Sequence, residues 1–206
     1  MNGFLLLILL FFVVYCIYAF LTSEIIESNI IDQREKARQG HLVAIDVRGK
    51  SVSLTTPAQR MVVLYQGALD GIYMLGAEKS LVGIQHNIYT NPEAFEYFSK
   101  LDPRIANREI KAPGNWENST NLESVISLKP DLVIIASGQS GAIELLESFG
   151  IPVFVVSPKT NEELFNELLG IGILTGTENR AKELIEYTQT RHSKPFSFHL
   201  FVKFFS

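Results

Sequence analysis

Three apolar runs of the sequence are each followed by residues whose side chains can hold a ligand. Tyr65 and Gln66 follow one run, His86 follows the next, and Gln139 follows a third. A neutral imidazole such as that of His86 can fill an open coordination position on a bound metal ion. No second histidine or carboxylate accompanies His86 at ligand spacing. These residues therefore predict contact with a metal complex, not a metal site built by the protein alone, and a hydrogen-bonded surface histidine is the alternative for His86.

Two further positions carry an aromatic ring or a guanidinium group. Trp116, the only tryptophan, lies in the segment Pro113–Asn118, where its ring can cover an apolar or aromatic chelate or instead fill the rim of the domain. Arg104, with Arg108 shortly after it, can pair with an anionic chelate such as a catecholate or carboxylate complex. A solvated loop is the alternative for both arginines.

The segment Gly138–Ala142 has the context of a hydrolase nucleophile turn, because it follows an apolar run and precedes a helical pattern. Such a turn needs glycine two residues after the serine, and this chain has Ala142 there. The only downstream histidines, His192 and His199, lie in an atypical tail. A small membrane-anchored α/β hydrolase with Ser140 as nucleophile therefore remains only as the alternative to a binding protein.

The elements that position these residues alternate along the chain. Apolar runs predict buried strands, and the segments between them show helical spacing. This alternation predicts an α/β fold with a doubly wound parallel sheet, whose binding loops lie at the carboxyl ends of the strands. A β-hairpin is predicted before the sheet, over His41–Leu54. The predicted strands are Met61–Tyr65, Leu81–Ile84, Asp131–Ala136 and Val153–Val156, and the helices are Ala68–Leu75, Pro92–Leu101, Leu122–Leu128 and Ala142–Phe149.

Composition excludes several classes of partner and site. The net charge is −4 and the pI is about 5.6, so the chain lacks the basic surface that favours nucleic acid. Cys16 is the only cysteine, which excludes a disulfide framework and a zinc site built from cysteines.

The N-terminus predicts export. Phe4–Leu21 carries no charge and is rich in large apolar residues, which fits a signal peptide or a membrane anchor over residues 1–22. Lipidation at Cys16 is disfavoured because the bulky Tyr15 precedes it. Residues 23–40 predict a polar linker, whose basic residues would oppose export under the positive-inside rule.

The C-terminal part divides into a helical stretch and a tail. Glu162–Gln189 has helical spacing, with a break expected near Thr175–Gly176 because glycine weakens a helix. Residues 191–206 are rich in phenylalanine and have no clear periodicity, so they are interpreted as an aberrant tail of an interrupted chain. Leu and Ile side chains of the helical stretch, together with this tail, predict an exposed apolar surface and poor solubility.

Three blocks of the sequence resemble the periplasmic solute-binding proteins of ABC importers for ferric siderophores, haem, cobalamin and related metal chelates. The first is Asp46–Val52 with Gln59–Leu64, the second is Leu75–Gly83, and the third is Asn121–Ile134 with Phe149–Val153. The resemblance covers about residues 43–190. It implies two α/β lobes joined by a long helix, with the ligand held in the cleft between the lobes.

The resemblance also implies function and domain organisation. Residues 41–160 would form the first lobe and residues 161–190 the helix between lobes, while the second lobe would be missing. The implied partners are a metal-chelate ligand and an ABC permease in the inner membrane, with no cofactor, no nucleic acid and a monomeric state for an intact family member. The chain would be exported to the periplasm or the outer face of the cytoplasmic membrane, it would not be an enzyme, and truncation could make it non-functional.

Overall fold

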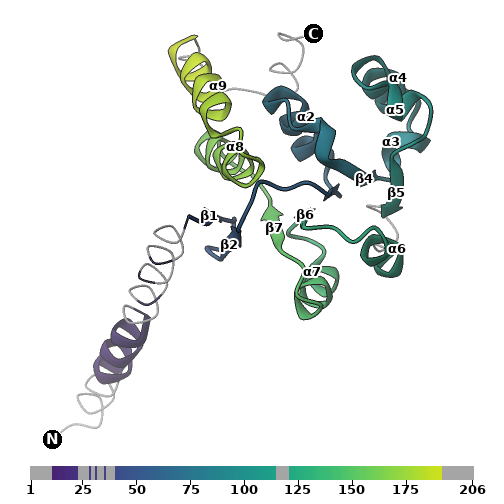
Figure 1. The fold of residues 1–206 in the computed structure, drawn as a ribbon. Helices are drawn as coiled ribbons and strands as arrows, with labels where there is room; N and C mark the ends of the chain where they lie inside the picture. Colours follow the sequence, from purple (N-terminus) through teal and green to yellow (C-terminus); the bar gives the residue numbers. More distant parts are fainter. Residues whose placement is uncertain are drawn as a thin grey trace, which may run out of the picture. The chain divides into compact units, whose positions relative to one another are not determined.

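The computed structural model describes residues 11–22, 28, 31, 35, 40–114 and 121–191. The chain divides into two compact units, Met1–Gly40 and His41–Ser206. In the first unit, residues 11–22 are helical and their large apolar side chains, among them Phe11 and Phe20, are exposed (Figure 1). Within the described residues, no helix combines the length and the apolar character needed to cross a membrane.

The second unit is built on a five-stranded sheet with the strand order β5-β4-β3-β6-β7. All neighbouring strands run parallel, and β3 pairs with β6 in an unbroken register from Met61↔Leu132 to Val63↔Ile134. The doubly wound parallel sheet predicted from the sequence is therefore confirmed. The strands are β3 (Met61–Val63), β4 (Leu81–Gln85), β5 (Lys111–Gly114), β6 (Leu132–Ala136) and β7 (Val153–Val156).

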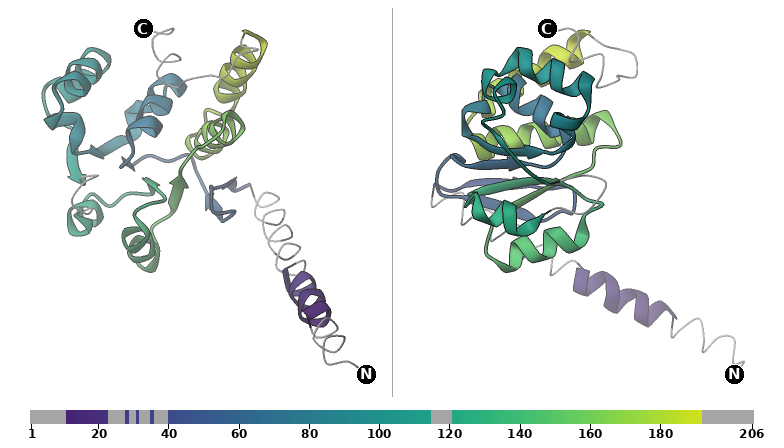
Figure 2. Two further views of the ribbon diagram at one scale, coloured as in Figure 1. Left: turned by 180° about the vertical axis from the view of Figure 1, so that it is seen from behind. Right: turned by 90° about the vertical axis from the view of Figure 1, so that its right-hand side faces the viewer.

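Helices cover both faces of this sheet. Figure 2 shows the sheet edge-on between two helical layers, with α6 and α7 on one face and the other helices of this unit on the opposite face. The first layer contains α6 (Leu122–Ser127) and α7 (Ser140–Ser148). The second contains α2 (Gln66–Leu75), α3 (Asn87–Thr90), α4 (Pro92–Leu101), α5 (Pro103–Ala106), α8 (Asn161–Thr175) and α9 (Glu178–Arg191), and a short 3-10 helix η1 (Glu78–Ser80) precedes β4.

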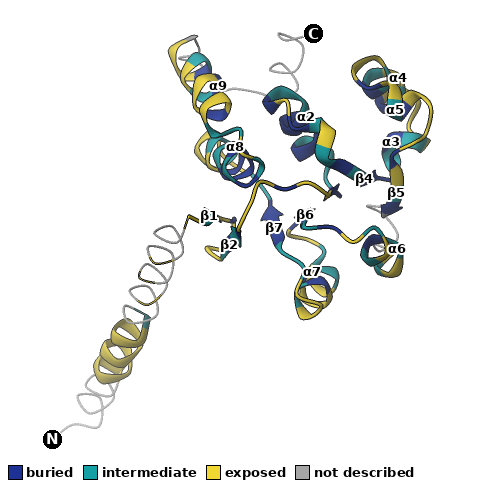
Figure 3. Ribbon diagram, in the orientation of Figure 1, coloured by how far each residue is buried: buried dark blue, intermediate teal, exposed yellow. Residues whose placement is uncertain are grey.

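The central strands are buried on both faces because successive side chains of a strand point to opposite sides. Val62 and Val133 belong to the apolar core beneath α6 and α7. Met61 and Leu132 belong to the core beneath α2 and α8. All of these side chains are fully buried, and the strands accordingly appear dark in Figure 3, while the outward faces of the helices are exposed. Parallel sheets require this double cover.

The hairpin formed by β1 (Leu42–Ile45) and β2 (Ser51–Leu54) was also predicted, and the structure confirms it. The buried carboxylate of Asp46 fixes its turn by accepting hydrogen bonds from the backbone N–H groups of Arg48 and Lys50 and from that of Val155 in β7. Arg48 pairs with Asp46 at 2.6 Å and with Glu147 of α7 at 2.8 Å. The hairpin is thus tied to the edge of the sheet by a buried charge with several donors.

The long helical stretch consists of two helices, as the glycine near its middle indicated. Gly176 ends α8 with a φ of 74°, a conformation that glycine adopts without steric cost. At the other end of α8, Thr160 and Glu163 form a reciprocal capping box. The prediction that residues 161–190 connect this lobe to a second one is not tested by these contacts.

Four elements were not predicted, namely the strand β5, the helices α3 and α5 and the 3-10 helix η1. The strand β5 carries the sequence Lys-Ala-Pro-Gly, which is typical of a loop, and Pro113 is tolerated there because β5 is an edge strand. The predicted loop Pro113–Asn118 is therefore wrong at its start, since Pro113 and Gly114 belong to β5 and residues 115–118 lie outside the described part. The helices α3 and α5 have only four residues each, too few to show periodicity.

Replacing Gly170 with alanine should destabilise the fold, because α8 packs closely on the sheet there. A Cβ atom at Gly170 would lie 2.6 Å from Cζ of the buried Phe154. Overpacking of this kind should lower the free energy of unfolding by about 1–2 kcal/mol after the gain in helix propensity. The matched control is Gly141→Ala in α7, where nothing lies within 4 Å and stability should hold or rise. Urea unfolding followed by circular dichroism measures both, and equal midpoints for the two variants would contradict this packing.

Candidate functional site

The chain reverses its direction of travel across the sheet between β3 and β6. From β3 it proceeds to β4 and β5 on one side, and it then crosses to β6 and β7 on the other side. The loops that leave the carboxyl ends of β3 and β6 consequently diverge, and the crevice outside such a switch point is where open α/β sheets bind ligands. Tyr65 and Gln66 follow β3, and Gln139 follows β6.

Tyr65 and Gln66 lie at the first turn of α2. Tyr65 has extended backbone angles and precedes the helix, and both side chains are half-buried. The amide oxygen of Gln66 accepts a hydrogen bond of 3.5 Å from the side-chain nitrogen of Asn87, which follows β4. The structure therefore brings together the loops after β3 and β4, as the sequence predicted.

His86 is half-buried directly after β4, next to two side chains that the sequence gave no reason to select. The side-chain oxygens of Gln85 and Asn87 are buried, and neither has a hydrogen-bond partner in the described part of the chain. Buried acceptors normally find a donor, so these two oxygens are exceptions to that rule among the described residues. No group of three or more metal-binding side chains occurs among the described residues, and contact between His86 and a metal ion stays a prediction.

Gln139 precedes the first residue of α7 and lies beside the crevice on the β6 side. Ser140 begins α7 and is exposed. The residue two positions on is Ala142, and the downstream histidines lie outside the described residues. Nothing in this geometry supports Ser140 as a hydrolase nucleophile.

Arg104 is not brought together with the other predicted residues. It lies in α5, which leads into the start of β5, and its side chain donates to Glu78 O at 2.7 Å just before the start of β4. It therefore sits toward the amino ends of the strands. The guanidinium of Arg104 pairs with the carboxylate of Asp102 at 2.7 Å. This hydrogen bonding raises the pKa of Arg104 above its ordinary value. A charge that is already paired has a structural role, and the carboxylate of Asp102 two residues earlier in the sequence was the available sign of it.

The remaining predicted residues have different outcomes. Arg108 stacks on the rings of Tyr89 and Phe95, with its guanidinium carbon 5.0 Å from each ring centroid. Trp116 lies outside the described residues.

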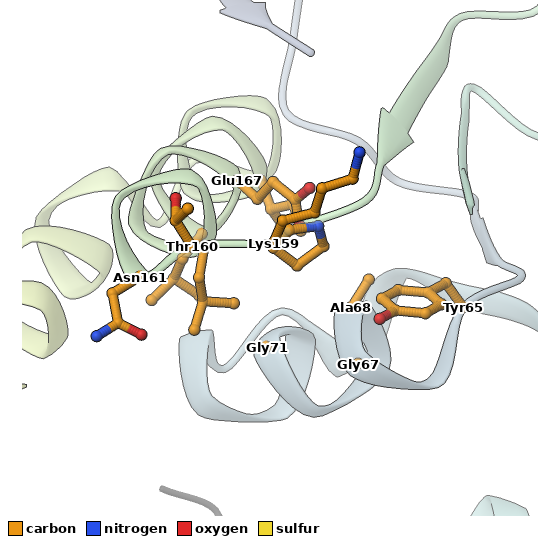
Figure 4. A pocket seen from close by; sticks show the side chains of 12 residues that line it. Tyr65, Gly67, Ala68, Gly71, Lys159, Thr160, Asn161 and Glu167 are labelled. Atoms are coloured by element: carbon orange, nitrogen blue, oxygen red, sulfur yellow. The ribbon is translucent and has the colours of Figure 1, made fainter. Parts of the chain in front are cut away.

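A cavity of about 220 Å³ opens between the start of α2 and the start of α8. Figure 4 shows Tyr65 on its α2 side and Glu167 on its α8 side, with Lys159 and Thr160 from the loop after β7. This loop also follows a parallel strand, so the rule that selected the other loops selects it too. That rule could not select Glu167, because Glu167 lies within a helix and its local sequence resembles that of an exposed helical turn.

Two buried carboxyl groups lie near Tyr65. Burial raises the pKa of Glu167 to about 7, although its Oε1 accepts a hydrogen bond of 2.6 Å from Ser157 N. Burial also raises the pKa of Asp70 to about 7, and Asp70 Oδ1 has no partner among the described residues. The pKa of Tyr65 is raised by its burial and then by the charges of Glu167 and Asp70. This end of the lobe therefore holds acidic groups whose ionisation is costly.

Comparison with known proteins gives one family and several relatives. A family profile described as periplasmic binding protein matches residues 61–192, more than half of the chain. The molybdate-binding protein MolA of Haemophilus influenzae is 30% identical over 121 residues, covering 58% of this chain and 33% of the relative. The iron(3+)-hydroxamate-binding protein FhuD of Bacillus subtilis is 27% identical over 133 residues, covering 65% of this chain and 37% of the relative.

A solved structure with a similar fold is also that of a solute-binding protein. The periplasmic solute binding protein from Veillonella parvula has a TM-score of 0.64 and 27% identity, covering 72% of this chain and 45% of that structure. The chain thus spans less than half the length of each of these three relatives.

Replacing Asp70 with asparagine should remove part of a pH dependence of stability. The ordinary pKa of the carboxyl is 3.8 and the folded value is about 7, so between these values the folded state binds more protons than the unfolded state. The free energy of unfolding therefore falls as pH rises through this window, by roughly 2–3 kcal/mol between about pH 5 and 8. Urea unfolding across this range should show a flatter profile for Asp70→Asn. The exposed carboxyl of Glu186 supplies the control, Glu186→Gln, and an unchanged slope in Asp70→Asn would refute the assignment.

Proposed function

Because the chain belongs to the periplasmic binding protein family, we propose that it acts as the substrate-binding component of an ABC import system. Its ligand is an iron chelate or another metal chelate such as a siderophore, which it captures and delivers to a permease in the membrane. The observation that supports this proposal is the switch point between β3 and β6, with polar side chains in the loops after both strands, in a fold similar to that of a solute-binding protein. Relatives named for iron(3+)-hydroxamate and for cobalamin support the ligand class.

The proposed roles of the side chains in ligand binding follow from their chemical groups. Tyr65, Gln66 and Gln139 offer hydrogen bonds to the polar groups of a chelate from both sides of the crevice. In this proposal His86 fills an open coordination site on the metal, and Trp116 supplies an aromatic surface. Arg104 is left out of the site because its charge is paired with Asp102.

Binding of this kind needs no covalent chemistry and no cofactor. The lobe formed by residues 41–160 supplies one wall of the ligand cleft. The apolar segment within residues 1–22 directs or anchors the protein at the cytoplasmic membrane, so that the ligand is captured in the periplasm or on the outer membrane face. The relative MolA is named for molybdate, so a binding test should also include this simple oxyanion.

The first test is a titration of the full chain, kept in a mild detergent, with ferric catecholates, ferric hydroxamates, haem, cobalamin, nickel–histidine and molybdate. Trp116 is the only tryptophan, so a change in its fluorescence on titration comes from this one side chain. We expect saturable quenching by at least one metal chelate. His86→Ala should weaken that binding about tenfold, the equivalent of one lost polar contact.

The matched control is His41→Ala, which removes an imidazole before β1 and away from the crevice. Its affinity should equal that of the unaltered chain. Absence of quenching by every chelate in the panel would sink the proposal, and equal affinities for the two variants would remove His86 from the site.

A further inference from the structure

The cavity between α2 and α8 is smaller than a typical pocket for a complete small molecule. Its volume is about 220 Å³, whereas pockets for complete small molecules typically measure about 300–1,000 Å³. At about 30 Å³ for each water molecule of the liquid, it has room for roughly seven waters. A single arm of a larger ligand fits this space. The cavity lies at the carboxyl edge of the sheet, because Tyr65 follows β3 and Lys159 follows β7.

Glu167 is the charged group built into this cavity. Glu167 is only 8% exposed. It nevertheless lines both the cavity and a separate groove between α8 and β1. Ser157 N donates to Oε1 at 2.6 Å. Within the described chain no hydrogen bond reaches Oε2. A carboxylate has room for several donors, so a buried one with a single donor is incompletely satisfied.

The charged groups around Glu167 do not supply the missing donor. On the α2 side, Tyr65 and Asp70 are the nearest titratable groups, and each can donate a proton but carries no positive charge. Glu163, one turn earlier in α8, accepts from the backbone N–H groups of Lys159 and Thr160. From the hairpin, Asp46 shares the groove and is paired with Arg48. No ion pair of the described residues joins the Lys159 ammonium group to Glu167.

We propose that this cavity is a subsite for a protonated amine, or an equivalent cationic N–H donor, carried on one arm of the captured ligand. The Oε2 atom of Glu167 accepts from the cation, and the ring of Tyr65 faces it from the opposite wall (Figure 4). A cation next to a buried carboxylate and an aromatic ring gains from both. This inference rests on the proposed binding function and narrows it to ligands that bear a basic group.

Burial of Glu167 makes the subsite sensitive to pH. Because burial raises the pKa of this carboxyl to about 7, it is mostly neutral at pH 6 and mostly charged at pH 8. An amine that stays protonated across this range therefore binds more tightly as pH rises. A neutral ligand of the same shape gains nothing from the change.

The test measures binding of butylammonium chloride to the full chain in mild detergent, with 1-butanol as the neutral probe of similar shape. Amide NMR signals of Gly67 and Gly71, which line the cavity, report occupancy. We expect saturable shifts with butylammonium and none with butanol. Affinity at pH 8 should exceed that at pH 6 by about tenfold, as expected when a titration of one carboxyl controls binding.

Two variants with the same change of charge separate the subsite from its surroundings. Glu167→Gln keeps an oxygen for Ser157 N but loses the charge, so amine affinity should fall at least about tenfold and lose its pH dependence. Glu162→Gln, on the exposed face of α8, should behave like the unaltered chain. If Glu167→Gln fails to fold, Tyr65→Leu tests the opposite wall and should also weaken the amine.

Several results would overturn the inference. Equal binding of butanol and butylammonium, or full amine affinity in a folded Glu167→Gln variant, each contradicts it. If a metal chelate binds and Glu167→Gln alters neither chelate nor amine affinity, the subsite falls and the proposed function stands. If the amine binds as expected and no chelate binds, the subsite stands and the proposed chelate function falls.

Discussion

The structure depends on the parallel pairing of β3 with β6 at the middle of the sheet. Both strands are buried on both faces, so helices must cover each side, and the helices can do so only if the chain leaves β3 and β6 in opposite directions. That divergence opens the crevice at their carboxyl ends. The positions of Tyr65, Gln66 and Gln139 at the carboxyl edge of the sheet are consequences of this one constraint on the backbone, and His86 follows the next strand outward.

The buried carboxylates show which parts of this scaffold are complete without a ligand. Asp46 accepts from three backbone N–H groups and from Arg48, so its burial is balanced and it serves to hold the hairpin. Glu167 accepts one described hydrogen bond, and Asp70 Oδ1 accepts none within the described residues. An ionised group in this condition is unfavourable by several kcal/mol and tends to take up a proton. The incomplete groups lie beside the cavity and Tyr65, which sets this end of the lobe apart from the hairpin.

Much of the fold was accessible from the sequence because buried parallel strands are short continuous apolar runs. The four predicted strands, the hairpin and the break at Gly176 all follow from local patterns. The edge strand β5 was not predicted, because its sequence Lys-Ala-Pro-Gly is not an apolar run. Site residues directly after strands could be found by one topological rule. Arg104 could have been excluded from its local pairing with Asp102 two residues earlier, and only its hydrogen bond to Glu78 O depends on a tertiary contact. Glu167 could not be found, because nothing local shows which helix positions face a cavity.

The central claim is that ligand binds at the carboxyl edge of the sheet, around the crevice between β3 and β6. Hydrogen–deuterium exchange of the full chain, with and without the metal chelate that binds most tightly, tests it directly. The account predicts that slowing of exchange is concentrated in the segments after β3, β4, β6 and β7, which contain Tyr65, His86, Gln139 and Lys159. Protection concentrated instead around Glu78 and Arg104, toward the amino ends of the strands, would contradict it.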